Sequence, residues 1–256
     1  MAEAVADPDA AARPETPPIL EGPKIAALSC GKPVYLVVLL PAEGSDGQSV
    51  IDLALNWAPT MPKADFVAAV APFAAPGGGR RWFDGDGMSP DAVAAGLGAV
   101  APRLDAFLDE MLAQRRLDDS HLALVGFSQG AMLALHVGLR RAKAMASIVA
   151  FSGALFDLEA LAGEIRARPQ VLMIHGEADP VVPFAAMAAT RERLKALGVP
   201  AKSMRRPGLG HETDDDGILA AGDFLTATVA RKPAAAAHDH EHEHDHDHDH
   251  DEAPGR

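Results

Sequence analysis

Short apolar runs alternate along the chain with longer stretches in which apolar residues recur at helical spacing. The runs predict strands at 25–28, 34–40, 65–71, 122–126, 146–151, 170–175 and 200–204. The longer stretches predict helices at 49–57, 89–114, 129–140, 184–197 and 214–230. Runs that are apolar throughout are typical of strands covered on both faces of a parallel sheet. The alternation therefore predicts a doubly wound α/β domain, with a mostly parallel sheet of about seven strands and helices on both faces.

Both ends of the chain have compositions that disfavour a folded core. Residues 1–18 combine alanine with acids and four prolines, and residues 233–256 include seven histidines that alternate with Asp and Glu. We expect these segments to be disordered flanks of a single α/β domain at 19–232.

The acidic charge of the chain is concentrated in those flanks. The formal net charge is −13, of which residues 238–256 contribute −7 and residues 1–17 contribute −3. The remaining body is mildly acidic and therefore lacks the electrostatic basis for binding nucleic acid. Cys30 is the only cysteine, which excludes an intramolecular disulfide and fits a reducing compartment. Since no stretch has the features of a signal peptide or a membrane span, we expect a cytoplasmic protein without a transmembrane segment.

A G-x-S-x-G motif stands between a predicted strand and a predicted helix. It consists of Gly126-Phe127-Ser128-Gln129-Gly130. A sharp strand-to-helix turn raises the serine oxygen above the sheet edge, where the helix N-terminus favours developing negative charge. A plain βα turn with a serine N-cap is the simpler interpretation of the same residues. The flanking strand and helix favour Ser128 as the nucleophile of an acyl-transfer reaction.

A serine nucleophile needs a general base and an acid that orients the base. Asp179 and His211 each follow a predicted strand, so we expect both at the edge of the sheet where Ser128 lies. Glu177 is an alternative acid because it is only two residues from Asp179. The other histidines before the tail fit the base position less well: His121, His136 and His175.

These motifs resemble those of the phospholipase/carboxylesterase family of small α/β-hydrolases, which includes bacterial carboxylesterases and acyl-protein thioesterases. The resemblance spans roughly 34–230 and is carried by four segments in the family's order, at 79–84, 126–131, 176–183 and 208–211. It implies an α/β-hydrolase fold and a cofactor-free serine hydrolase with Ser128, His211 and Asp179 as its triad. It also implies that Trp82 and Phe83, which alone would be taken for core residues, shape an acyl pocket.

One segment departs from the family pattern. Members usually carry Leu-His-Gly-x-Gly after the second main strand, where the backbone forms part of the oxyanion hole, and this chain has Leu40-Pro41-Ala42-Glu43-Gly44. The donor is a main-chain N–H, so Glu43 can still serve beside Gln129. A Glu43 carboxylate near the site would disfavour anionic substrates.

More than one function fits these residues. We expect hydrolysis of carboxylic esters with short to medium acyl chains, so the partner is a small-molecule ester or an acylated substrate. The alternative substrates are thioesters, on proteins or small molecules, and lysophospholipids, since the machinery is the same. A homodimer is also left open.

A different function class is a metal-binding protein with an inactive hydrolase body. Imidazole alternating with carboxylate suits Ni(II), Zn(II) or Cu(II). The candidate ligands in the tail are His238, His240, His242, His244, His246, His248 and His250.

Overall fold

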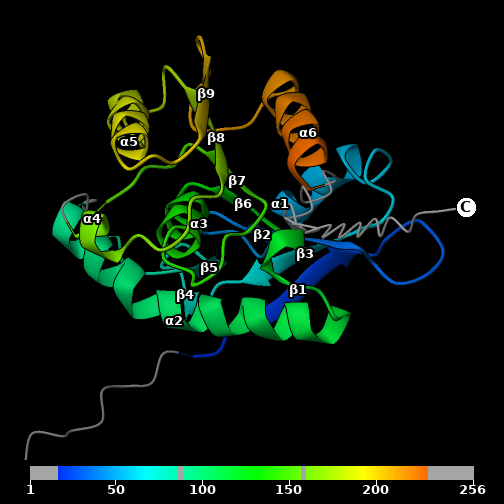
Figure 1. Ribbon diagram of the computed structural model, residues 1–256. Coiled ribbons are helices and arrows are strands. Elements are labelled where there is room, and N and C mark those ends of the chain that lie inside the picture. Colours follow the sequence, from blue (N-terminus) through cyan, green and yellow to red (C-terminus); the bar gives the residue numbers. More distant parts are fainter. Residues whose placement is uncertain (1–16, 86–88, 157–159, 230–256) are drawn as a thin grey trace, which may run out of the picture.

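The computed structural model describes residues 17–85, 89–156 and 160–229 (Figure 1). Its main sheet has seven strands in the order β1-β3-β2-β6-β7-β8-β9. These are β1 (Leu20–Ile25), β2 (Tyr35–Leu40), β3 (Ala64–Val70), β6 (Leu122–Phe127), β7 (Ser147–Phe151), β8 (Gln170–Gly176) and β9 (Ala201–Arg206). Strand β1 is antiparallel to β3, and all other neighbours in this sheet are parallel. A separate hairpin pairs β4 (Phe73–Ala74) with β5 (Arg80–Arg81).

Helices cover both faces of the main sheet (Figure 1). One face buries side chains of α2 (Pro90–Arg115), α3 (Gln129–Gly138), α4 (Leu161–Glu164) and α5 (Phe184–Ala196). The other face buries side chains of α1 (Gln48–Leu53), the 3₁₀ helix η1 (Ala54–Asn56) and α6 (Asp215–Val229). Another 3₁₀ helix, η3 (Asp119–His121), leads into β6. Because the central strands are covered on both sides, their residues are apolar throughout, and the predicted doubly wound α/β architecture is confirmed.

The first predicted strand is wrong, whereas the other six agree with observed strands to within two residues. The sequence predicts a strand at 25–28, but β1 runs from Leu20 to Ile25. Gly22 and Pro23 interrupt its apolar pattern. Strand β1 lies at the edge of the sheet and its register shifts between Glu21 and Lys24, which is a position that tolerates proline.

The five predicted helices are all present, and the starts of α2 and α6 follow the expected capping chemistry. Helix α2 begins at Pro90, and the Ser89 hydroxyl accepts the N–H of Ala92 at 3.3 Å. Asp214 accepts the N–H of Gly217 at 3.0 Å at the start of α6. The predicted helix at 49–57 is divided between α1 and η1. The single turn α4 and the β4–β5 hairpin were not predicted, since such short elements leave no periodicity.

Two sequence predictions fall largely or wholly outside the described residues. They are the disordered flanks at 1–18 and 233–256, and the metal-binding histidines of the tail. Within the described part of the chain, no helix has the length and apolar character needed to cross a bilayer.

Candidate active site

Ser128 lies at a strained turn between β6 and α3. Its backbone has φ 55° and ψ −120°, a left-handed conformation that non-glycine residues rarely adopt. Its N–H donates to the carbonyl of Phe151 at 3.0 Å, and its carbonyl accepts the N–H of Met132 at 3.0 Å. Bonds on both sides thus hold the turn in this conformation.

The two glycines of the motif are required by close backbone contacts. A Cβ on Gly126 would lie 2.4 Å from the carbonyl oxygen of Gly130. A Cβ on Gly130 would lie 2.0 Å from the carbonyl oxygen of Leu40. Any side chain at either position would therefore push apart β6, α3 and the loop that follows β2.

Ser128, His211 and Asp179 form one hydrogen-bonded series at the carboxyl edge of the sheet. The Ser128 Oγ lies 3.0 Å from His211 Nε2. On its other side, His211 Nδ1 lies 2.8 Å and 3.0 Å from the two carboxylate oxygens of Asp179. Because a carboxylate only accepts, Nδ1–H of a neutral His211 donates to Asp179 and Nε2 accepts the serine O–H.

The Asp179 carboxylate is buried and receives several donors. The backbone N–H groups of Val181 and Val182 donate to it at 2.9 Å each. Burial raises the pKa of Asp179, but hydrogen bonds from His211, Val182, Val181 and the Ser152 side chain outweigh burial, so its pKa lies below the usual value. The group is therefore an anion at neutral pH, and it favours the imidazolium form of His211 during a reaction.

Glu177, the alternative acid, is placed away from His211. It is exposed, and its carboxylate lies 3.7 Å from the guanidinium of Arg205. The structure therefore brings Asp179, and not Glu177, to the histidine. Of the other histidines, His121 contacts Asp118 at 2.9 Å, and His136 is buried in α3.

His175 supports the loop at 177–183, which carries Asp179 and is called the acid loop below. The sequence did not predict this contact. The His175 Nε2 donates to the carbonyl of Val182 at 2.8 Å and lies 3.3 Å from Asp179 Oδ2. The ring is 1% exposed and packs edge-on against Phe184, with the ring centroids 6.0 Å apart. The spacing of four residues between His175 and Asp179, across the end of a strand, was the only signal for this contact.

The loop that carries His211 rests on the acid loop. The N–H of Ala178 donates to the carbonyl of Leu209 at 3.0 Å, and a Cβ on Gly176 would lie 2.3 Å from that same oxygen. The ring of Phe127 lies beside the imidazole, with 4.9 Å between centroids. The two loops therefore position the histidine and its acid together.

The loop after β2, whose sequence departs from the family pattern, is held by the β4–β5 hairpin. The N–H of Gly44 donates to the carbonyl of Arg80 at 2.8 Å, and the N–H of Arg80 donates to the carbonyl of Ser45 at 3.3 Å. A Cβ on Gly79 would lie 2.1 Å from the carbonyl oxygen of Gly44. Main-chain contacts with the hairpin therefore hold the path of this loop.

The Gln129 side chain connects this loop to the core. Its Nε2 donates to a carboxylate oxygen of Glu43 at 2.7 Å and to the carbonyl of Phe83 at 3.3 Å. Its Oε1 accepts the N–H of Trp82 at 3.1 Å, and the Trp82 indole N–H donates to the carbonyl of Pro41 at 2.8 Å. Trp82 and Phe83 are 0% and 2% exposed, so they lie behind Gln129 in the core, and a part in an acyl pocket stays a prediction.

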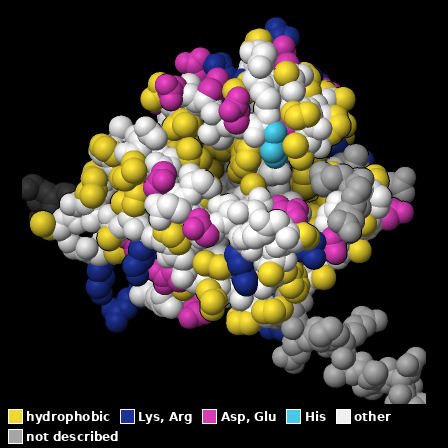
Figure 2. All heavy atoms as spheres, turned by 180° about the vertical axis from the view of Figure 1, so that it is seen from behind, with side chains coloured by type: hydrophobic (Ala, Val, Ile, Leu, Met, Phe, Trp, Pro, Cys, Tyr) yellow, Lys and Arg dark blue, Asp and Glu magenta, His cyan; other side chains and the backbone are white. Residues whose placement is uncertain are grey.

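A cavity of about 440 Å³ adjoins His211. Its apolar lining residues include Val50, Leu53 and Phe127, and its acidic lining residues are Glu43 and Glu212. Neither Trp82 nor Phe83 is among its lining residues. Figure 2 shows a face of the molecule on which a histidine side chain is accessible between hydrophobic and acidic groups. In the described parts of the chain, no group of three or more His, Cys, Asp or Glu side chains is placed to hold a metal ion.

Comparisons with known proteins place these features in a family. The sequence model of the phospholipase/carboxylesterase family matches residues 27–229. Esterase YpfH of Escherichia coli (strain K12) is 29% identical over 205 residues, which cover 78% of this chain and 86% of YpfH. Acyl-protein thioesterase 1 of Neurospora crassa is 34% identical over 125 residues, which cover 45% of this chain and 51% of that protein.

A solved structure agrees with the sequence comparisons. The crystal structure of esterase PE8 has 40% sequence identity and a TM-score of 0.78, and the match covers 81% of this chain and 98% of that one. The family match covers more than half of the chain and includes every residue of the Ser128 series. The chain therefore belongs to the phospholipase/carboxylesterase family of α/β-hydrolases and is a hydrolase of the carboxylesterase type.

Proposed function

We propose that this protein cleaves carboxylic esters with short to medium acyl chains through Ser128, His211 and Asp179. The observation that carries the proposal is the continuous hydrogen-bonded series, at 3.0 Å from Ser128 Oγ to His211 Nε2 and 2.8 Å from His211 Nδ1 to Asp179. Serine becomes a competent nucleophile only beside a base, and the base is effective only when its tautomer is fixed.

Acylation uses the two nitrogens of His211 in turn. Nε2 takes the hydroxyl proton as Ser128 Oγ bonds to the ester carbonyl carbon, and Asp179 stabilises the imidazolium through Nδ1–H. The tetrahedral intermediate then collapses, the bond to the alcohol oxygen breaks, and Nε2–H protonates that oxygen. The alcohol leaves and the acyl group stays on Ser128.

Two main-chain N–H groups would stabilise the oxyanion. Gln129 supplies one at the first residue of α3, where the helix N-terminus adds a favourable field. Glu43 supplies the second from the loop held by the hairpin. Because these donors belong to the backbone, the replacement of the family's His-Gly by Pro41-Ala42 leaves them available.

Deacylation repeats the same steps with water. Nε2 removes a proton from water as its oxygen attacks the acyl carbon, and it then returns that proton to Ser128 Oγ. The carboxylic acid leaves as its anion and its proton passes to solvent. Neither half of the reaction requires a metal or an organic cofactor.

A fluorophosphonate probe tests this proposal directly, because it reacts only with an activated serine. We expect stoichiometric labelling of the wild-type protein on Ser128, located by mass spectrometry of the labelled peptide. His211→Ala should label at least about 100-fold more slowly, since the base is lost. An unlabelled but folded wild type would reject the proposal and favour a hydrolase body without activity.

A thioester is the second candidate substrate, favoured by the similarity to a protein named acyl-protein thioesterase. The same residues would act, with a thiolate in place of the alkoxide as leaving group. A butyryl oxygen ester and a butyryl thioester whose leaving groups differ only in oxygen versus sulfur would distinguish the two. A kcat/KM for the thioester more than about tenfold above that for the oxygen ester would make thioesters the preferred class.

A further inference from the structure

The cavity beside His211 lies where the alcohol part of an ester must bind. On the proposed mechanism, His211 protonates the leaving oxygen, so that oxygen must come within hydrogen-bond reach of Nε2. His211 is in the wall of the cavity, and Glu212 and Thr213 continue the same wall. The group attached to the leaving oxygen therefore extends into this cavity, and the cavity residues select the alcohol.

The cavity carries two carboxylates and no cationic side chain among its described lining residues. They belong to Glu43 and Glu212, which are both lining residues. The Glu43 carboxylate is held by the Gln129 amide at 2.7 Å, and an amide fixes its position without neutralising its charge.

Arginines in the flanking segments are engaged elsewhere. The Arg80 guanidinium donates to the carbonyls of Ala71 and Pro72 at 2.7 Å and 2.6 Å. The Arg206 guanidinium is paired with Asp214 at 2.6 Å and also with Asp216. Neither guanidinium is directed at the carboxylates of the cavity.

The rest of the lining suits a bulky, weakly hydrated group. Val50, Leu53 and Phe127 provide apolar surface, and the exposed part of an aromatic ring attracts a cation. A small, strongly hydrated ammonium would lose water against these side chains, whereas a quaternary ammonium would lose little.

We propose that the cavity selects esters whose alcohol carries a quaternary ammonium group. This inference rests on the proposed function. Two carboxylates several Å from a cation, at a partly exposed site, favour it over a neutral group of the same shape by about tenfold after salt screening.

Choline butyrate and 3,3-dimethylbutyl butyrate provide the test, because their acyl groups are identical and their alcohols differ only in the charged nitrogen. We expect kcat/KM of the wild type to be about tenfold higher for the choline ester at low salt, with the ratio falling as NaCl is added. Glu43→Gln and Glu212→Gln should each lower the ratio about threefold, and the double variant should bring it near one. Glu110→Gln, on the exposed surface of α2, is the matched control and should leave the ratio unchanged.

The outcomes separate the two proposals. A wild-type ratio at or below one, or a ratio that survives in the double variant, overturns the charge selection while leaving the esterase proposal intact. Absence of turnover for both esters, together with absence of fluorophosphonate labelling, overturns the esterase proposal itself. A melting temperature and a circular dichroism spectrum like those of the wild type, measured for each variant, show that a change in ratio comes from the carboxylates and not from misfolding.

Discussion

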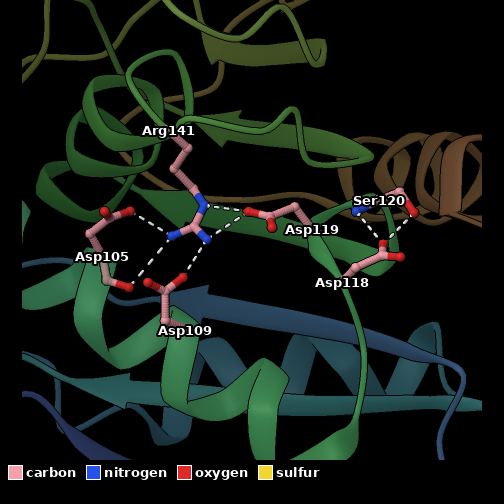
Figure 3. Close-up of polar contacts among 6 residues, drawn as sticks. All are labelled: Asp105, Asp109, Asp118, Asp119, Ser120 and Arg141. Carbon is pink, nitrogen blue, oxygen red and sulfur yellow. Dashed lines mark hydrogen bonds and ion pairs between the residues drawn. The ribbon is translucent and has the colours of Figure 1, made fainter.

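Opposite ends of α3 carry two polar clusters of different kinds. At its start, Ser128 meets His211 and Asp179. Just beyond its end, the Arg141 guanidinium donates five hydrogen bonds to residues of α2 and η3 (Figure 3). Its carboxylate partners are Asp105 at 2.5 Å, Asp109 at 2.6 Å and Asp119 at 2.6 Å.

The two clusters differ in whether a proton can move. Burial lowers the pKa of Arg141, but hydrogen bonds to Asp109 and Asp119 and the nearby carboxylate charges outweigh it, so its pKa lies above the usual value. The guanidinium therefore stays protonated, and all five of its N–H groups are used. His211 instead has one nitrogen that can accept a proton from Ser128 and one fixed by Asp179. Both clusters are buried and hydrogen-bonded, but only the cluster at Ser128 has a transferable proton beside the proposed nucleophile.

The largest effect should come from Ser128→Ala. Removing the proposed nucleophile should lower kcat/KM for p-nitrophenyl butyrate by about 10⁴-fold or more, with the melting temperature nearly unchanged because alanine removes only the hydroxyl. Steady-state kinetics and thermal unfolding measure the two effects. Substantial turnover by the folded variant would show that another group is the nucleophile.

Asp179→Asn should have the next largest effect, a fall in kcat of about 10²- to 10⁴-fold. An amide leaves the size of the side chain unchanged but can hold His211 in the wrong tautomer. Glu177→Gln is the matched control, and it should retain nearly full activity because its partner is Arg205. Equal losses in the two variants would contradict the assignment of Asp179.

The pH dependence of stability follows from the same carboxylate. Since the pKa of Asp179 is lowered from 3.8 in the folded protein, its ionised form stabilises the fold above that value. This contribution is lost as the pH falls through the lowered pKa. The difference in unfolding free energy between wild type and Asp179→Asn should be constant from about pH 8 to pH 5 and shrink below about pH 4. Urea unfolding across this range measures it.

Arg141→Met should reverse the pattern of Ser128→Ala. Loss of the guanidinium leaves three carboxylates together and should lower the unfolding free energy by about 2–4 kcal/mol. We expect a value near the lower end of this range because Asp105 and Asp109 are partly exposed to solvent. The kcat/KM of the folded fraction should change less than about threefold. A large loss of kcat at unchanged stability would mean that the two ends of α3 are coupled.

His175→Phe should give a smaller effect on activity, about a tenfold fall in kcat. The carbonyl of Val182 loses its donor, so the acid loop holds Asp179 less firmly. His175→Asn, which keeps a donor, should recover part of the loss. If both variants retain wild-type kcat and pH profile, the histidine serves packing alone.

Removal of residues 238–256 should have the smallest effect on ester turnover. The tail contains no apolar residue that could dock on the catalytic body except Ala253 and Pro254. We expect unchanged kcat/KM and loss of most Ni(II) or Zn(II) binding in calorimetric titrations. A chelator-sensitive esterase activity in the full-length protein would contradict this separation.

Sequence patterns predict the central strands well because helices cover both faces of the sheet there, and strands buried on both sides consist of apolar residues. Strand β1 escapes this rule, since an edge strand with Gly22 and Pro23 has neither continuous burial nor alternation. The site follows a similar division. Ser128, Asp179 and His211 could be predicted because each follows a strand and parallel strands bring their carboxyl ends to one edge.

Contacts made by side chains across long sequence separations could not be predicted. The bond from Gln129 to Glu43 joins residues 86 positions apart, and the bond from Arg141 to Asp105 joins residues 36 positions apart. Nothing in the local sequence encodes such pairs, since they depend on how helices and loops are packed. The contact between His175 and Asp179 spans only four residues, and it was missed because it depends on the path of the loop after β8.

The attachment of the loop after β2 to the β4–β5 hairpin bears on how the family can diverge. Backbone bonds from Gly44 to Arg80 and from Arg80 to Ser45 set the path of this loop. Because these bonds do not depend on side chains, mutations in the loop can accumulate without breaking them. Over evolutionary time, the residues of such a loop can be substituted and can introduce a new charge such as that of Glu43. Gly79, in contrast, cannot be replaced without a clash with the carbonyl of Gly44. We therefore expect stronger selection on the hairpin than on the loop that it supports.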